Sequence, residues 1–187
     1  MTKTGSTHKL SIAKQIAFTA AFAALCMLGT ILVSVPLPAS GYFNVGDVFV
    51  LLSGWCLGPV FGFTAAAIGS ALADVLTGYA LYAPATFLIK GLDALAAWFV
   101  WSLAKKAIKK SSLDFLPRIA GAIVGEVLMT ALYFFFESVI LGLGLGALPN
   151  IAGNALQGAC CAALAVAIVS ALYPLKPVGQ FFPHLRK

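Results

Sequence analysis

Long apolar stretches, separated by short breaks rich in glycine, proline and lysine, make up most of this chain. A helix that crosses a bilayer needs about 20 mostly apolar residues. We expect helices over six stretches: Ile16–Ser34, Val45–Leu57, Val60–Gly78, Pro84–Ala104, Leu116–Leu141 and Ile151–Tyr173. The second is short, and Gly58-Pro59 separates it from the third. The pattern predicts an all-α polytopic membrane protein with six transmembrane helices, one domain over residues 1–187 with tails at about 1–14 and 175–187.

Polar residues recur inside these stretches at helical spacing. The sets are Asn44 and Asp47; Ser70, Asp74 and Thr77; Thr86, Lys90 and Asp93; Glu126, Thr130, Tyr133 and Glu137; and Asn150, Asn154 and Gln157. Residues three or four apart lie on one face of a helix. Ionisable groups at bilayer depth are costly, so they normally face a bundle interior or a cavity. Several such faces together predict a polar pocket for a small molecule.

The composition and the distribution of charge give the orientation. Mean hydropathy is +0.99, and 10% of the residues are charged, against roughly 25% in soluble domains. The basic residues form clusters: Lys3, Lys9 and Lys14; Lys105, Lys106, Lys109, Lys110 and Arg118; and Lys176, Arg186 and Lys187. In a six-span topology all three clusters lie on one side, which the positive-inside rule places in the cytoplasm. The net charge of +6 is therefore a topology signal and not a nucleic-acid-binding surface.

With both termini inside, the polar sets fall in the outer half of the membrane. Lys90 lies six residues after Pro84, hence about 9 Å below the outer end of its helix. A channel or proton relay needs polar groups through the whole thickness. We therefore expect a cup that is open to the outside and closed below. The alternative is structural: hydrogen bonds between helices, worth about 0.6 kcal/mol each, and a pairing of Lys90 with Asp93 inside one helix.

We expect the substrate to contact side chains from these sets and the aromatic residues near the mouth. The predicted substrate-binding residues are Tyr42, Asn44, Asp47, Asp74, Tyr79, Tyr82, Thr86, Lys90, Asp93, Glu126, Tyr133, Asn150, Asn154 and Gln157. The loop from Pro36 to Phe43 is apolar and aromatic, and we expect it to fold over the bundle as a lid.

The first helix carries a stripe of small residues. Its members are Ala13, Ala17, Ala20 and Ala24, with Ala21 beside them. Small residues let another helix approach closely, so this face predicts a partner-docking site, with packing inside the bundle as the alternative. Glycines at the same spacing, Gly54, Gly58 and Gly62, are interpreted as internal packing.

Other chemistry is not indicated. Cys26, Cys56, Cys160 and Cys161 lie in apolar stretches without ligand spacing, so we predict no metal, disulfide or cofactor. No GxxxxGK[ST] phosphate loop occurs, so the chain has no ATP site of that kind. The N-terminus is similar to a signal peptide, but the apolar run is longer than the usual one, and we expect a retained helix.

Several segments together resemble the substrate-binding S components of energy-coupling factor (ECF) vitamin transporters, in particular the riboflavin-type branch. They are Tyr42-Phe43-Asn44-Val45-Gly46-Asp47-Val48, Gly58-Pro59-Val60-Phe61-Gly62, Gly69-Ser70-Ala71-Leu72-Ala73-Asp74, Tyr82-Ala83-Pro84-Ala85-Thr86 and Ile89-Lys90-Gly91. The resemblance implies a six-helix fold in the plasma membrane of a prokaryote and an outward-facing vitamin site capped by the first loop. It also implies a transmembrane coupling subunit, docked on the alanines of the first helix, and through it two cytoplasmic ATPases.

The balance of charge restricts the ligand. The predicted pocket region contains one lysine, Lys90, and five acidic residues: Asp47, Asp74, Asp93, Glu126 and Glu137. A strongly anionic ligand is therefore disfavoured. Aromatic side chains suit a flat heteroaromatic ring, and amides and carboxylates suit its polar edge. A B6-type ligand is favoured, with riboflavin, hydroxymethylpyrimidine and cobalamin as alternatives. An intramembrane enzyme and a structural or regulatory partner are the other function classes, although no nucleophile–base motif indicates an enzyme.

Overall fold

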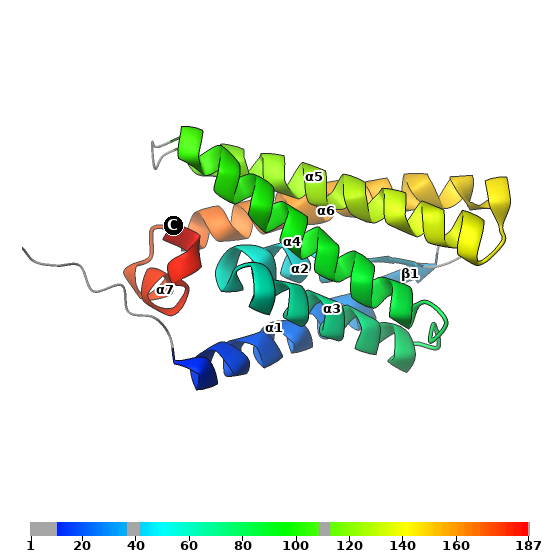
Figure 1. The fold of residues 1–187 in the computed structure, drawn as a ribbon, viewed down its shortest axis with the longest axis horizontal. Coiled ribbons are helices and arrows are strands. Elements are labelled where there is room, and N and C mark those ends of the chain that lie inside the picture. The colour runs from blue at the N-terminus through cyan, green and yellow to red at the C-terminus, as the bar shows by residue number, and fades with distance from the viewer. Residues whose placement is uncertain (1–10, 37–41, 109–112, 187) are drawn as a thin grey trace, which may run out of the picture.

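The computed structural model describes residues 11–36, 42–108 and 113–186. In these ranges the chain is a helical bundle with a small β-ribbon at one end (Figure 1). The helices are α1 (Ile12–Leu32), α2 (Gly46–Leu57), α3 (Pro59–Leu76), α4 (Ala83–Ala107), α5 (Phe115–Phe135), α6 (Leu148–Leu172) and α7 (Lys176–Phe181). A π-helical turn, η2 (Phe136–Ile140), continues α5, and two 3-10 turns, η3 (Gly144–Ala147) and η4 (Pro183–Arg186), precede α6 and follow α7.

Among the described residues, five helical segments are long and apolar enough to cross a membrane, and α2 is not among them. Its 12 residues cover only about 18 Å at 1.5 Å per residue, against a hydrocarbon core of about 30 Å. Every α2 residue except Phe49 is buried, because α1, α3, α4, α6 and the C-terminal turn η4 pack around it. The predicted all-α membrane bundle is confirmed. The segment Val45–Leu57, which we expected to be one of six spans, is a central helix of about half the length of the others.

The loop expected to act as a lid contains a two-stranded antiparallel ribbon where it is described. β1 (Ser34–Pro36) pairs with β2 (Tyr42–Asn44), with Val35 opposite Phe43. β1 is exposed on all three residues, whereas Tyr42 and Asn44 of β2 are buried. Residues 37–41 of the predicted lid lie outside the described residues. The ribbon thus turns the side chains of Tyr42 and Asn44 toward the bundle interior, because alternate residues of a strand point to the same side.

The C-terminal segment closes the end of the bundle where α2 stops. Gly58 follows α2 with φ 81°, and a Cβ there would lie 2.8 Å from the His184 ring, so only glycine fits this turn. Leu185 is 1% exposed, and the ring of Phe182 lies 5.1 Å from that of Phe18 on α1. The described part of the expected C-terminal tail, residues 175–186, therefore packs under α2 instead of extending away.

A buried arginine holds this closed end together. Arg118 donates from Nε to Asp114 Oδ2 at 2.8 Å and from Nη2 to the Leu185 carbonyl at 3.0 Å. Its guanidinium lies 4.6 Å from the centre of the Trp101 ring, a cation–π distance. Lys105 adds a second cation 2.5 Å from Asp114 Oδ1. A charge that was expected to signal topology thus also has a packing role.

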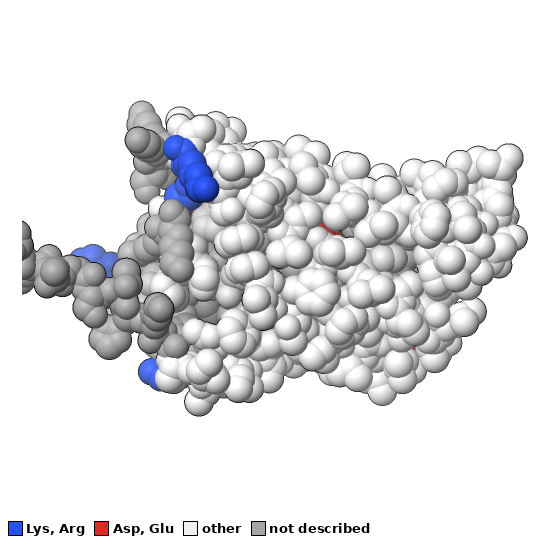
Figure 2. All heavy atoms as spheres, in the orientation of Figure 1, with Lys and Arg blue, Asp and Glu red and all other residues white. Residues whose placement is uncertain are grey.

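Apart from Lys90, the described basic side chains gather at this same end. Figure 2 shows blue atoms near the start of α1, near α7 and at the end of α4, while the rest of that face is almost free of charge. The turns from α3 to α4 and from α5 to α6 lie at the opposite end (Figure 1). The cytoplasmic placement of the basic end stays a prediction, resting on the positive-inside rule.

Cysteine labelling from outside intact cells tests that orientation. In a Cys160→Ala background, which removes the exposed native thiol, Ala80→Cys should react with a membrane-impermeant maleimide and Lys106→Cys should not. Both positions are exposed in the structure and lie at opposite ends of the bundle. Lysis before labelling serves as the control and should make Lys106→Cys reactive. Labelling of Lys106→Cys in sealed cells contradicts the predicted topology.

Candidate functional site

A polar cleft lies at the end of the bundle opposite the basic cluster. Its empty volume is about 470 Å³, including space open to solvent. Side chains from β2 and from every long helix line it, together with the turn between α3 and α4. They are Thr30, Tyr42, Asn44, Ser70, Asp74, Tyr79, Tyr82, Thr86, Lys90, Tyr133, Glu137, Asn154 and Gln157.

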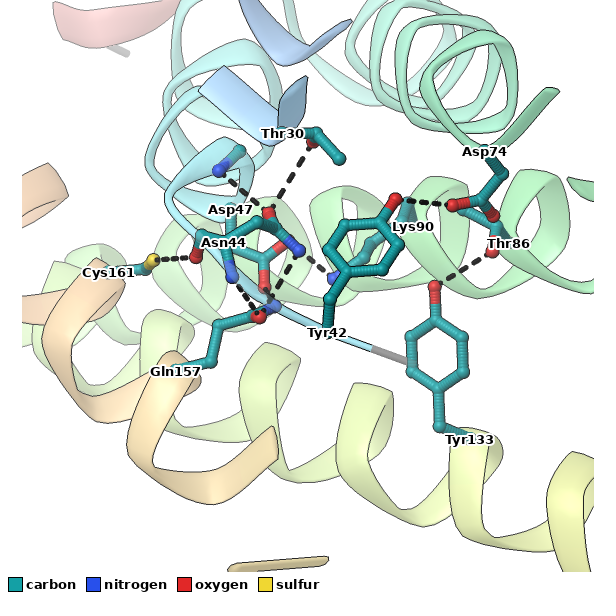
Figure 3. A network of polar contacts seen from close by, with 11 residues as sticks. Thr30, Tyr42, Asn44, Asp47, Asp74, Thr86, Lys90, Tyr133, Gln157 and Cys161 are labelled. Atoms are coloured by element: carbon teal, nitrogen blue, oxygen red, sulfur yellow. Dashed lines mark hydrogen bonds and ion pairs between the residues drawn. The ribbon is translucent and has the colours of Figure 1, made fainter. Parts of the chain in front are cut away.

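An ion pair between α2 and α4 forms the floor of the cleft (Figure 3). Lys90 Nζ lies 2.5 Å from Asp47 Oδ1, and both side chains are at most 5% exposed. The other carboxylate oxygen, Asp47 Oδ2, accepts from Gln157 Nε2 of α6 at 2.5 Å. A buried charge pair is tolerated only where further hydrogen bonds satisfy the remaining lone pairs and protons. The amide of Gln157 supplies one of them.

Asn44 extends this network into the β-ribbon. Its backbone N–H donates to Gln157 Oε1 at 2.7 Å, and its side-chain Oδ1 accepts from the Gly46 N–H at 2.9 Å. The Thr30 hydroxyl of α1 also donates to Asn44 Oδ1, at 3.4 Å, and the Cys161 thiol donates to the Asn44 carbonyl. The network thus fixes the position of β2 against α1, α2 and α6.

Tyr42 crosses the cleft from the ribbon to α3. Its hydroxyl donates to Asp74 Oδ1 at 2.6 Å (Figure 3). Burial and the neighbouring Asp74 carboxylate raise the pKa of Tyr42, so the hydroxyl keeps its proton and remains a donor. Across the cleft, the hydroxyls of Thr86 and Tyr133 lie 2.9 Å apart. These contacts line one wall with hydroxyl groups and ring faces.

The π-helical turn at the end of α5 brings Glu137 into the cleft. The Glu137 carboxylate accepts from Asn150 Nδ2 at 3.0 Å and from the Tyr82 hydroxyl at 3.4 Å. π-helical turns are rare and often occur at functional sites. The turn therefore marks the part of α5 where the regular helix gives way to the cleft wall.

Most of the predicted substrate-binding residues come together in this cleft. Those that line it are Tyr42, Asn44, Asp74, Tyr79, Tyr82, Thr86, Lys90, Tyr133, Asn154 and Gln157. The other predicted residues, Asp47, Asn150, Asp93 and Glu126, do not line it. Asp47 lies behind Lys90, Asn150 lies behind Glu137, and Asp93 and Glu126 are placed deeper in the bundle.

The structure also adds cleft residues and changes one pairing. Thr30, Ser70 and Glu137 line the cleft but were not in the predicted set. Ser70 and Glu137 belong to the sets of polar residues that recur at helical spacing in the sequence. Thr30, near the end of α1, belongs to none of these sets, so the sequence did not indicate it. Lys90 pairs with Asp47 of α2 and not with Asp93 of its own helix. Lys90 and Asp93 are three residues apart and share a face of α4. However, α2 packs closely enough against α4 that the Asp47 carboxylate reaches the Lys90 ammonium.

The alanine stripe of α1 faces outward. Ala13, Ala17, Ala20, Ala21 and Ala24 are all exposed, so packing inside the bundle does not explain them. Ala20, Ala23 and Ala24 also line an apolar groove between α1 and α3, which is completed by Phe61 and Ile68. By contrast, a Cβ on Gly62 would lie 2.7 Å from the Ser53 carbonyl, as expected for a glycine of internal packing.

Three comparisons with known proteins give the family. The model of the family "ECF-type riboflavin transporter, S component" matches residues 9–174. An uncharacterized protein of Pyrococcus woesei is 34% identical over 130 residues, covering 68% of this chain and 80% of the relative. A solved structure of the S component of a bacterial ECF transporter is similar in fold, with a TM-score of 0.64 at 18% identity, covering 88% of this chain and 98% of the other.

The chain is an integral membrane protein of the S-component fold. It belongs to the family of S components of ECF-type riboflavin transporters. It is therefore a multi-pass subunit of a prokaryotic membrane transporter for vitamin uptake, with a substrate and an ECF module as its partners. The prediction that the chain is not an enzyme is confirmed, because the family is a transport family. The intramembrane enzyme is set aside for the same reason.

Removal of the charge of Lys90 tests the role of the ion pair. Lys90→Met leaves Asp47 as a buried, uncompensated carboxylate, and we expect a loss of about 3–5 kcal/mol in the free energy of unfolding. The double variant Lys90→Met/Asp47→Leu should recover most of this loss, because it removes both charges. Lys106→Met, an exposed lysine at the other end, is the control. The measurement is denaturant unfolding in detergent; equal stability of the single and double variants contradicts the assignment.

Proposed function

We propose that this chain captures a water-soluble vitamin or vitamin precursor from outside the cell and delivers it through a coupling subunit. The observation that carries the proposal is the cleft, which gathers polar and aromatic side chains at the end of the bundle opposite the basic residues. Family membership supports the transport role. The packed C-terminal segment at the other end fits a protein that binds at one side and needs a partner to release its ligand.

The lining favours a small ring with a hydrogen-bonding edge. Tyr42, Tyr79 and Tyr82 form a continuous row of rings, with centroids 4.8 Å and 6.1 Å apart. Aromatic faces suit a flat heterocycle, and convergent polar groups fix its orientation. A B6-type ligand is favoured, and riboflavin and hydroxymethylpyrimidine are alternatives. Cobalamin is disfavoured, because a ligand of its size requires the ribbon to move away from the cleft.

The ribbon acts as the cap of the site in this proposal. Tyr42 and Asn44 are held from below by Asp74 and Gln157, whereas β1 is exposed. A ligand that enters the cleft competes with Tyr42 for Asp74, so we expect the ribbon to lift during binding. This is the lid expected from the apolar loop, although residues 37–41 lie outside the described part of the chain.

We propose that the exposed alanine face of α1 docks the transmembrane coupling subunit. The face consists of small residues, points outward and continues into the apolar groove between α1 and α3. Close helix approach in membranes uses such faces. The energy for uptake then comes from two cytoplasmic ATPases bound to the coupling subunit, consistent with a chain that carries no phosphate loop.

Amide-to-leucine changes in the cleft test ligand binding. Asn154→Leu and Gln157→Leu should each weaken binding of the ligand that co-purifies with the protein by roughly 5- to 150-fold, the equivalent of about 1–3 kcal/mol for a lost buried hydrogen bond. Ser102→Leu, at the inner end of α4, is the control and should bind normally. Affinity is measured by titration of purified variants after identification of the ligand by mass spectrometry, with a thermal melt for folding. Unchanged affinity in both cleft variants rejects the site.

Bulky substitutions on α1 test docking separately. Ala20→Trp and Ala24→Trp should keep ligand binding but abolish ATP-driven uptake and co-purification with the coupling subunit, because an indole prevents close approach of another helix. Ala163→Trp places the same ring on an exposed alanine of α6 and should assemble normally. Normal assembly and transport by both α1 variants would falsify the docking face.

A further inference from the structure

The cleft carries more negative than positive charge, and its one lysine is already paired. Resting on the proposed function, we propose that the substrate is a small aromatic cation, whose positively charged nitrogen binds Asp74 and Ser70 on α3 beside the rings of Tyr42 and Tyr79. The site assigned to the charged nitrogen is the α3 wall of the cleft. The ring system of the substrate then lies toward Asn154 of α6.

The charge balance is the first argument. In the described part of the chain, the carboxylates in and beneath the cleft are Asp47, Asp74, Asp93, Glu126 and Glu137, whereas Lys90 is the only basic side chain in the lining. Asp47 neutralises Lys90 at 2.5 Å. Of the other acids, Asp74 and Glu137 line the cleft itself, and they favour a cation there, because opposite charges attract strongly where water is excluded.

The second argument is an unfilled acceptor position. Asp74 Oδ1 accepts from Tyr42, but Asp74 Oδ2 is buried without a hydrogen-bond partner among the described residues. Ser70 Oγ, one helical turn away on the same face, is buried and unpartnered in the same way. Both atoms belong to residues that line the cleft. A buried acceptor without a donor is costly, so a ligand N–H placed there removes a penalty and gains a charge-assisted hydrogen bond.

The third argument comes from the tyrosine rings. Cations bind over aromatic faces within about 6 Å of the ring centre, and aromatic cages hold cationic ligands in this way. Lys90 Nζ already lies 5.4 Å from the centre of the Tyr133 ring. Tyr42 and Tyr79, whose centroids are 4.8 Å apart, provide further faces beside Asp74. The wall that carries the unfilled acceptors therefore also carries the rings that a cation prefers.

An anionic substrate finds no matching partner in the same cleft. The Lys90 ammonium is directed at Asp47, and the Gln157 amide N–H is directed at the same carboxylate. An anion would have to displace Asp47 from both and would lie near Asp74 and Glu137. Such a site discriminates by charge, because like charges brought together are as unfavourable as opposite charges are favourable.

A matched pair of ligands tests the proposal on the purified chain. Pyridoxamine carries a protonated aminomethyl group where pyridoxine carries a neutral hydroxymethyl group on the same ring. We expect pyridoxamine to bind at least about 10-fold more tightly, the difference between a charge-assisted and a neutral hydrogen bond. Riboflavin and pyridoxal phosphate serve as neutral and anionic probes, and both should bind more weakly than pyridoxamine.

Variants locate the preference in the cleft. Asp74→Asn should reduce the ratio of the pyridoxamine and pyridoxine affinities to about one. Ser70→Ala is the second variant, used if Asp74→Asn does not fold, and it should reduce the ratio partially. Asp114→Asn, which changes a carboxylate at the other end of the bundle, should keep the ratio. Retention of the full ratio by folded Asp74→Asn, or equal loss in Asp114→Asn, overturns the assignment to Asp74.

The outcomes also separate this proposal from the capture function. Binding of pyridoxine or riboflavin at least as tight as that of pyridoxamine overturns the cationic substrate and leaves vitamin capture standing. Failure of every probe to bind a folded chain that also carries no co-purified ligand overturns both.

Discussion

The ion pair of Lys90 and Asp47 is the interaction on which the arrangement of this bundle depends. It joins α4 to the short central helix α2, and Gln157 and Asn44 continue it to α6 and to the ribbon. Both side chains are almost completely buried, so each charge requires the other at close range. The pair therefore fixes the depth of α2 and provides the floor of the cleft.

The short length of α2 explains the asymmetry of the molecule. A half-length helix leaves one end of the bundle without a central element. The described C-terminal residues fill that end: Leu185 is buried there and accepts from Arg118 of α5, and His184 lies against Gly58. The other end keeps the cleft and the ribbon. A bundle that is packed at one end and hollowed at the other is suited to capture a ligand, because the described C-terminal residues close the end opposite the cleft.

The same fold separates two surfaces of different composition. The cleft gathers tyrosines, carboxylates and amides from six elements, whereas α1 presents small residues to the outside. α1 contributes to the cleft only through Thr30 near its end. The residues proposed to dock a partner are therefore separate from those that line the cleft.

The sequence by itself determined the membrane class, the helices and the faces of the polar residues, because helical periodicity and apolar length are local properties. The stripes with Asp74, Lys90 and Gln157 predicted which residues meet in one cleft, and the S-component resemblance agreed. Only the tertiary structure decided the partners: Lys90 with Asp47 across helices, Tyr42 with Asp74 across the cleft, and Asp93 and Glu126 below it. The packing of the C-terminal segment against Arg118 also gave no local signal. Partners between distant segments depend on how far each helix is shifted along its neighbours, and that shift follows from the packing of the whole bundle and not from the spacing within any one segment.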